Sequence, residues 1–280
     1  MKPGVVLSLF PGVGLLDRGF EHHGFCVFRG PDLLWGGDIR TFHPPRGSCW
    51  GIIGGSPCQD FSAARRAAPT GEGRKLMGEF ARCVLEAEPE WWLLENVPRA
   101  PSVTEIKPEL CHLFPNAQRI DVNAAWYSGV SRLRHFQFGS RTGITLQIPR
   151  GRPVRGAEPA ALASDGRSFR ELCRLQGLPD GYSLPGFTIE EAKRAVGNGV
   201  PFVLACVLAK AVCQAYRIET GAVPEFDETH CDRRRCACGC GRALSGRHLY
   251  DSAACRKRAE RRRRRDSSMP GSVTGPLSCP

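Results

Sequence analysis

Short apolar runs alternate with amphipathic stretches along the first hundred residues. Four runs have the length and composition of buried strands: 5–10, 25–28, 50–54 and 91–94. The stretches 15–22 and 75–88 have helical spacing instead, and the first turns four residues inward: Leu15, Leu16, Gly19 and Phe20. This alternation predicts βαβ units, so we expect an α/β fold with a parallel sheet and flanking helices.

The second half of the chain is less regular. Residues 134–138 alternate like an antiparallel strand, and 202–216 form a strongly apolar helical stretch. Two capping-box spacings predict helices that begin at their first residue: Ser168 with Glu171, and Thr188 with Glu191. Residues 141–167 show neither period, and 217–230 have the composition of a linker.

Length and composition limit the class of protein. The 280 residues are 41% hydrophobic, which is enough for one substantial core with a small appendage. No apolar run approaches the ~18 residues that a membrane span requires, and the N-terminus leads directly into the first strand rather than into a signal peptide. We therefore expect a soluble, cytoplasmic protein with no membrane partner.

Positive charge is concentrated near the C-terminus. The formal net charge is +11, and residues 232–265 alone carry 13 basic and 3 acidic side chains. A basic segment attached to a near-neutral body is typical of proteins that bind a polyanion.

The 14 cysteines fall into two groups, eight before residue 231 and six from Cys231 onward. Without a secretion signal, we expect the first group to be reduced, with at most one reactive thiol, and the second group to bind metal. Five cysteines of the first group are expected in the core: Cys26, Cys83, Cys173, Cys206 and Cys213.

Candidate chemistry lies where predicted strands end, because open α/β sheets bind ligands at the carboxyl ends of their strands. Gly12 and Gly14 follow the first strand and would let a ligand approach the backbone, although a tight turn alone would explain them. Cys58 follows the third strand in a Gly-Gly-Ser-Pro loop, which suits an exposed nucleophile better than a core thiol. Glu95 ends the strand at 91–94; it is either a partly desolvated acid, a helix cap or a surface charge.

These motifs together resemble those of the DNA cytosine C5 methyltransferases. They occur in that family's order and cover residues 5–212. The segments that carry the resemblance are Phe10-Pro11-Gly12-Val13-Gly14, Pro57-Cys58-Gln59, Glu95-Asn96-Val97, Arg132 with Arg134, residues 170–179 and Gly197-Asn198-Gly199-Val200.

The resemblance implies a Rossmann-like sheet that binds S-adenosylmethionine, and a covalent mechanism. Cys58 would add to C6 of a cytosine flipped out of the duplex, and Glu95 would protonate N3. Arg132 and Arg134 would lie near the base carbonyl and the active-site carboxylate, where a guanidinium stays charged and donates in a planar fork.

The resemblance also implies which residues contact the cofactor: Phe10, Gly12, Gly14, Asp38, Pro57, Asn198 and Val200. The family's acidic residue after the second strand has no direct counterpart here. Phe28 and Arg29 occupy that stretch, and Asp32 follows them.

The expected partner is double-stranded DNA, bound by a monomer. The loop 60–74 would close over the flipped base, with Arg65 and Arg66 on phosphates. The recognition region that varies among family members is reduced to residues 141–167, too few for a core of their own, and would offer Arg150, Arg152 and Arg155 to the DNA backbone.

The cysteine-rich end resembles a small zinc knuckle followed by a basic helix. Its expected ligands are Cys236, Cys238, Cys240 and Cys255, with Cys231 or His248 as substitutes, and the alternative is a basic tail that binds no metal. In either form, Arg256 and Arg258 would add salt-sensitive affinity for phosphates.

The expected organisation therefore has six parts: a catalytic and cofactor-binding core at 1–140, the recognition region at 141–167, the rest of the core at 168–216, the linker at 217–230, the cysteine-rich segment at 231–265 and a disordered tail at 266–280. Two other functions stay open, an RNA (tRNA) cytosine methyltransferase and a catalytically silent nucleic-acid-binding relative. The expected setting is restriction-modification in a bacterial host, with the protein associated with the nucleoid or encoded by a phage.

Overall fold

The computed structural model describes residues 4–63, 65–154, 156–161, 166–218 and 256–257. The chain divides into two units, Met1–Phe226 and Asp227–Pro280. In the second unit the description is limited to Arg256 and Lys257, which are exposed and helical.

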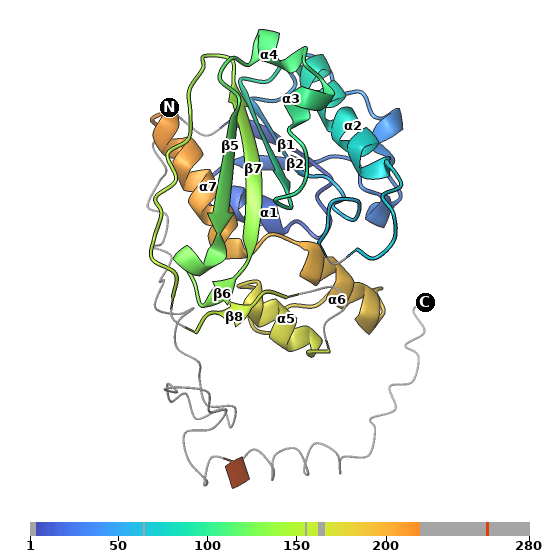
Figure 1. Ribbon diagram of the computed structural model, residues 1–280, viewed down its shortest axis with the longest axis vertical. Coiled ribbons are helices and arrows are strands. Elements are labelled where there is room, and N and C mark those ends of the chain that lie inside the picture. The colour runs from blue at the N-terminus through green and yellow to red at the C-terminus, as the bar shows by residue number, and fades with distance from the viewer. Residues whose placement is uncertain (1–3, 64, 155, 162–165, 219–255, 258–280) are drawn as a thin grey trace, which may run out of the picture. The chain divides into compact units, whose positions relative to one another are not determined.

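A six-stranded sheet with the order β2-β1-β3-β4-β7-β5 organises the first unit (Figure 1). Strands β2, β1, β3 and β4 are parallel, whereas β7 runs antiparallel to both of its neighbours. The strands are β1 (Val5–Leu9), β2 (Cys26–Arg29), β3 (Gly51–Gly55), β4 (Trp91–Asn96), β5 (Gln118–Asn123) and β7 (Leu133–Ser140). The parallel part confirms the expected α/β fold, and the antiparallel pairing of residues 134–138 is confirmed as well.

Helices cover both faces of the sheet because its central strands are apolar on both sides. Trp91 packs with α1 (Leu15–His22) and α7 (Phe202–Ala215), whereas the next residue, Trp92, packs with α2 (Glu72–Ala87), α3 (Val103–Ile106) and α4 (Leu110–Leu113). Gly19 lets α1 and α7 approach closely, since a Cβ there would lie 2.4 Å from the backbone of Ala205. The pattern is that of a buried parallel strand between two helical layers.

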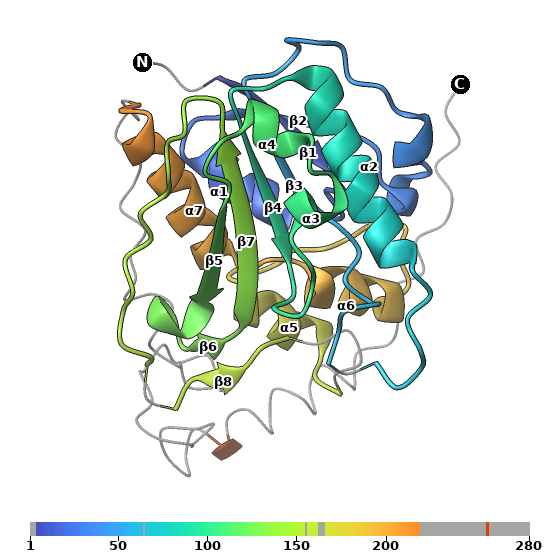
Figure 2. The ribbon, with the colours of Figure 1, turned by 45° about the horizontal axis from the view of Figure 1, so that its top comes forward.

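Two helices lie beyond one end of the sheet. The arrowheads of β4 and β5 point toward α5 (Phe169–Leu175) and α6 (Ile189–Asn198) in Figure 2. Both helices begin with the expected capping boxes, Ser168 with Glu171 and Thr188 with Glu191. The carboxyl ends of the parallel strands, where ligands bind in such sheets, therefore face α6.

Several boundaries differ from the sequence-based expectation. Helix α2 begins at Glu72 instead of Lys75, inside the predicted loop, because Asp60 accepts a hydrogen bond from Gly73 N near its start. Strand β5 was not predicted. Residues 158–159 form a two-residue strand, β8 (Glu158–Pro159), that pairs with β6 (Val130–Ser131) in a region expected to have no strand.

One expected core cysteine was placed wrongly. Cys83, Cys173, Cys206 and Cys213 are buried, as predicted, but Cys26 is exposed. It lies on β2 at the edge of the sheet, where Phe28 on the same face is also exposed. The helical layers leave this edge strand uncovered, so apolar composition alone does not bury it.

The stretch Ile189–Ala215 is 27 residues long, and its most apolar window of 18 residues has a mean hydropathy of 1.8, which would suit a membrane span. However, 72% of its most apolar window is buried in the protein, and Gly199, Val200 and Pro201 separate α6 from α7. A buried, interrupted stretch of this kind is typical of core helices.

Candidate active site

The turn after β1 has an unusual backbone and is held by the segment that follows β2. Phe10, Gly12 and Gly14 all have positive φ, +54°, +54° and +75°. Gly12 N donates to the Asp32 carboxylate at 2.8 Å, and Gly12 O accepts a hydrogen bond from Trp35 Nε1 at 2.7 Å. A Cβ at Gly12 would meet no atom of the described part of the chain within 4 Å, so the space beside this turn leaves room for a ligand.

A fully buried carboxylate supports the same turn from α1. Asp17 accepts hydrogen bonds from Ser8 Oγ at 2.6 Å and from Arg29 Nε at 2.9 Å. Burial raises the pKa of Asp17 above its ordinary value, although Ser8 and Arg29 both act to lower it. Asp17 thus ties the first two strands to the helix that begins at the turn.

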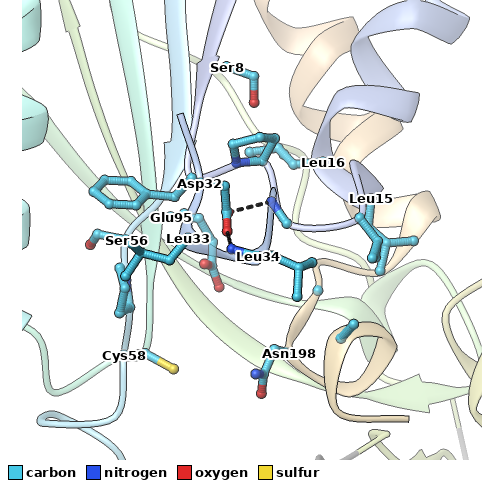
Figure 3. Close-up of a pocket in the computed structure, with 18 of the residues that line it drawn as sticks. Ser8, Leu15, Leu16, Asp32, Leu33, Leu34, Ser56, Cys58, Glu95 and Asn198 are labelled. Carbon is cyan, nitrogen blue, oxygen red and sulfur yellow. Dashed lines mark hydrogen bonds between the residues drawn. The ribbon is translucent and has the colours of Figure 1, made fainter. Parts of the chain in front are cut away.

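A cavity of about 420 Å³ lies at the carboxyl ends of β1, β3 and β4 and reaches α6 (Figure 3). This volume falls in the range of cofactor and small-molecule sites. The lining residues include most of the sequence-predicted site: Phe10, Gly12, Asp38, Pro57, Cys58, Glu95, Arg134, Asn198 and Val200. Gly14 and Arg132 do not line the cavity. Gly14 is buried at the start of α1, with the Arg29 guanidinium beside it.

Cys58 and Glu95 reach the cavity from neighbouring parallel strands. Gly55 at the end of β3 pairs with Glu95 near the end of β4. Cys58 comes three residues after Gly55. In Figure 3 the Cys58 sulfur and the Glu95 carboxylate point toward the same space. Burial raises the pKa of the Cys58 thiol above its ordinary value of 9.0, and the charge of Glu95 raises it further, against the effect of Arg134 and Arg132.

Glu95 forms an ion pair with Arg134, whose Nε lies 2.9 Å from Oε1. Glu95 is 7% exposed. Burial raises the pKa of its carboxyl above the ordinary 4.5 because the loss of hydration outweighs the effect of the two arginines. The site therefore holds an acid that can keep its proton at higher pH than a free carboxyl, next to a half-buried thiol.

Asn96 links this acid to the cysteine loop. Its Nδ2 donates to Ser56 Oγ at 2.9 Å and to Ser56 O at 3.3 Å, and its Oδ1 accepts a hydrogen bond from Val97 N at 2.8 Å. Ser56 precedes Cys58 by two residues. The ends of β3 and β4 are thus fastened to each other at the point where the two reactive groups leave the sheet.

Arg132 supports the site from outside the cavity. It is 3% exposed and donates to Ala161 O at 2.7 Å and to Gly197 O at 2.9 Å, while its Nε has no hydrogen-bond partner among the described residues. Gly197 directly precedes Asn198, so this guanidinium fixes the end of α6 against the body. Its positive charge nevertheless lowers the pKa values of Cys58 and Glu95.

The loop after Cys58 is folded onto itself. Asp60 accepts hydrogen bonds from Thr70 N at 3.0 Å and Gly73 N at 2.9 Å, which lower its pKa to about 2. Arg65 pairs with Asp60 at 3.3 Å and donates to Ala68 O at 2.7 Å, so its guanidinium is engaged within the loop. Arg66, by contrast, is exposed.

The predicted recognition region packs along the sheet. Gln118 of β5 bonds the backbone of Leu146 through both ends of its amide, at 2.8 and 2.9 Å, and Leu146 is buried. Arg150 lies over the Trp126 ring, and Arg152 is exposed. Between residues 141 and 154 the chain therefore runs as a strap beside β5.

Several predicted site residues lie outside the part of the chain that the structure describes: Arg155, Arg258, Cys236, Cys238, Cys240 and Cys255. Within the described ranges, no group of three or more His, Cys, Asp or Glu side chains is arranged to hold a metal ion.

The sequence did not predict Asp17 as a site residue. It placed Asp32 only near the position of the family's acidic cofactor contact. The signal for Asp17 was a charge inside an apolar helical stripe, between Leu16 and Gly19. The signal for Asp32 was its Gly-Pro-Asp turn, which follows a strand at the ligand-binding edge. Both carboxylates line the cavity.

Comparison with known proteins agrees with this geometry. Residues 36–109 match the family described as C-5 cytosine-specific DNA methylase. The Type II methyltransferase M.HgiGI of Herpetosiphon aurantiacus is 44% identical over 116 residues, a match covering 34% of this chain and 90% of that protein. The chain belongs to the C-5 cytosine-specific DNA methylase family.

A second relative and a solved structure extend the comparison of this C-5 methylase. The Type II methyltransferase M.HgiDI of the same organism is 33% identical over 130 residues, which cover 39% of this chain. The chain spans less than half of that relative, 41% of its length. A DNA modification methyltransferase encoded within an E. coli prophage has the same fold, with a TM-score of 0.58 over 76% of this chain and 99% of its own, at 18% identity.

Proposed function

We propose that this C-5 methylase transfers a methyl group from S-adenosylmethionine to C5 of cytosine in double-stranded DNA. The observation that carries the proposal is the meeting of Cys58, Glu95 and Arg134 at one cavity, which continues past the glycine turn to α6. A thiol, a carboxyl with a raised pKa and a guanidinium are the three groups that nucleophilic activation of a pyrimidine ring requires.

The cavity suits an adenosyl amino acid. Phe10, Leu33 and Leu34 offer apolar surface, while Asp32, Asp38 and Asn198 offer polar atoms at different points of the same wall. The free space beside Gly12 leaves room for close approach to the backbone. When bound there, S-adenosylmethionine supplies an electrophilic methyl group on its sulfonium.

The chain's own residues would activate the base in two coupled steps. The Cys58 thiolate forms a bond to C6 while the Glu95 carboxyl places a proton on N3, so the electron pair of the C5–C6 double bond becomes available at C5. After C5 has been methylated, its proton leaves to water, which restores the C5–C6 double bond and expels the thiolate, and N3 returns its proton to Glu95. Because the charge of Glu95 raises the pKa of Cys58, a protonated Glu95 favours the thiolate.

A stacked cytosine cannot reach Cys58, so the base must leave the duplex. Arg134, held against Glu95, would then donate to the carbonyl of the flipped base. We propose that the loop containing Arg65 and Arg66 closes over it, with the exposed Arg66 free to meet a phosphate and Arg65 able to do so once it leaves Asp60.

The proposal includes the finer organisation expected from the sequence. The strap at 141–154 and its exposed Arg152 would contact the DNA backbone as a reduced recognition region. The cysteine-rich segment from Cys231 onward would bind zinc through its thiolates and, with Arg256 and its basic neighbours, add salt-dependent affinity. Metal analysis of the purified full chain would show zinc at about one equivalent per chain if this assignment holds, and none if the segment is only a basic tail.

The test of the reaction is methyl transfer from labelled cofactor to duplex DNA by the full chain, with Cys58→Ser as the matched variant. We expect the wild type to label DNA, C5-methylcytosine to be the product, and the Cys58→Ser variant to be inactive. Transfer to tRNA but not to duplex DNA would refute the DNA substrate, and full activity of Cys58→Ser would refute the nucleophile. Sedimentation of the active protein with and without DNA tests the proposed monomer.

A further inference from the structure

The loop that follows Glu95 and Asn96, residues 97–102, is held through its carbonyl groups by side chains of β7 and β5. His135 Nδ1 lies 2.7 Å from Val97 O, and Gln137 Nε2 lies 2.9 Å from Pro101 O. Arg119 of β5 donates to two further carbonyls, Pro98 O at 2.5 Å and Ala100 O at 2.9 Å. Four of the six carbonyls in this short connection therefore accept a hydrogen bond from a side chain.

The hydrogen bonds determine how the protons are placed. Gln137 Oε1 accepts a hydrogen bond from Val103 N at 2.6 Å, and its Nε2 faces the carbonyl of Pro101, so the amide cannot be turned around. The same Nε2 lies 2.8 Å from His135 Nε2. That imidazole nitrogen must accept, so His135 is neutral and carries its proton on Nδ1, from which it donates to Val97 O.

The surroundings favour this neutral form. His135 is fully buried, and burial together with the charge of Arg119 lowers its pKa to about 4. On the neighbouring strands it faces Asn96 of β4 and Asp121 of β5, and Asp121 is exposed. The pair of His135 and Gln137 is thus a neutral, fully hydrogen-bonded unit within the sheet.

We propose that His135 and Gln137 are positioning residues for methyl transfer, fixing loop 97–102 and through it the Glu95 carboxyl and the Cys58 loop. The connection is direct, because Val97 donates to Asn96, and Asn96 in turn holds Ser56. A shift of Val97 would reach both reactive groups. The proposal rests on the proposed function and deepens it, since neither residue lines the cavity or touches the substrate.

Three full-length variants test the role in catalysis. His135→Leu removes the donor to Val97 O, and His135→Asn keeps an N–H at nearly the same place. Phe138→Leu is the matched control, because Phe138 is equally buried on the same strand but packs on the opposite face, toward α7. Each variant is compared with the wild type by single-turnover methyl transfer, by the KM for S-adenosylmethionine and by hydrogen exchange of loop 97–103.

We expect His135→Leu to lower the single-turnover rate by about 10- to 100-fold, the loss that an ångström-scale misplacement of catalytic groups causes. Its KM for the cofactor should stay within about twofold, because the glycine turn and α6 are untouched. Loop 97–103 should exchange faster, His135→Asn should recover most of the rate, and Phe138→Leu should change neither rate nor loop exchange. A wild-type rate in His135→Leu with a loosened loop would overturn the proposal, as would a slow rate with an unchanged loop.

A spectroscopic test checks the proton placement without any activity. In Gln137→Glu a carboxylate replaces the donor to His135, so the imidazole should become charged at neutral pH, whereas the wild-type ring stays neutral. Nitrogen NMR of histidine-labelled protein separates these forms. A charged ring in the wild type, or a neutral one in the Gln137→Glu variant, would overturn the assignment. An inactive wild type would refute the proposed function while leaving this measurement and the exchange measurement intact.

Discussion

The guanidinium of Arg134 lies 2.9 Å from the Glu95 carboxylate, although the two residues are on neighbouring antiparallel strands and are not register partners. Arg134 reaches across the end of β4 and enters the cavity beside Cys58. Its positive charge lowers the pKa values of both Glu95 and Cys58, while burial raises them. Burial and the charges of Arg134 and Arg132 therefore act on both the Glu95 carboxyl and the Cys58 thiol.

The first prediction concerns thiol reactivity without DNA or cofactor. Glu95→Gln removes the negative charge that raises the pKa of Cys58, so the thiolate fraction at mildly alkaline pH should increase. We expect iodoacetamide to alkylate Cys58 roughly threefold faster or more in this variant, because the thiolate is the reactive form. Mass spectrometry of the Cys58 peptide separates this signal from that of the exposed Cys26 and Cys111.

The matched control for this experiment is Glu90→Gln, which removes a carboxylate just before the opposite end of β4. It should leave the alkylation rate of Cys58 unchanged. An equal or slower rate in Glu95→Gln would contradict the coupling between the two groups.

The second prediction concerns the pH dependence of methyl transfer. Arg134 lowers the pKa values of both Glu95 and Cys58, so Arg134→Met should raise both and move both limbs of the pH profile to higher pH. The rate at the optimum should fall by about 100-fold, as for loss of one charged donor at a reacting carbonyl. Arg134→Lys keeps the charge, and its alkaline limb should stay near that of the wild type. A profile that does not move in Arg134→Met would show that Arg134 does not set the pKa values that control the rate.

The third prediction separates backbone strain from cofactor binding. Gly12→Ala places a Cβ in the free space beside the turn at φ +54°, so it should raise the KM for S-adenosylmethionine by about tenfold or more. Gly47→Ala imposes similar strain at φ +70°, also with no atom within 4 Å, but on the loop before β3. The two variants should lose similar stability in thermal unfolding, and the KM should rise only in Gly12→Ala. Equal KM values would show that the ligand does not approach this turn.

The fourth prediction concerns the loop after Cys58. Asp60→Asn replaces a carboxylate that accepts from Thr70 N, Gly73 N and Arg65, so the loop should open more often. Trypsin should then cleave after Arg65 and Arg66 several times faster, about fivefold or more, because proteolysis follows the open population. Asp180→Asn, at an exposed position of another loop, should leave this cleavage rate unchanged. Unchanged cleavage in Asp60→Asn would mean that Asp60 does not hold the loop.

The sequence by itself determined the parallel half of the sheet, the longer helices beside it and two polar side chains at its edge. Periodicity reports which side chains point inward, and a residue that follows an apolar strand must emerge at that strand's end. For this reason Cys58 and Glu95 could be placed at one edge, and the capping boxes at Ser168 and Thr188 could be located to the residue.

The tertiary structure alone decided what lies between those landmarks. Strand β5 has two apolar residues, Ile120 and Val122, and it forms where β7 offers its backbone as a partner. The Arg132 guanidinium lies outside the cavity because it donates hydrogen bonds to the carbonyls of Ala161 and Gly197. The start of α2 depends on Asp60, and loop 97–102 depends on His135, Gln137 and Arg119. Each of these outcomes rests on a hydrogen bond between residues more than ten positions apart. The pattern of apolar and polar residues along the chain does not predict such a bond.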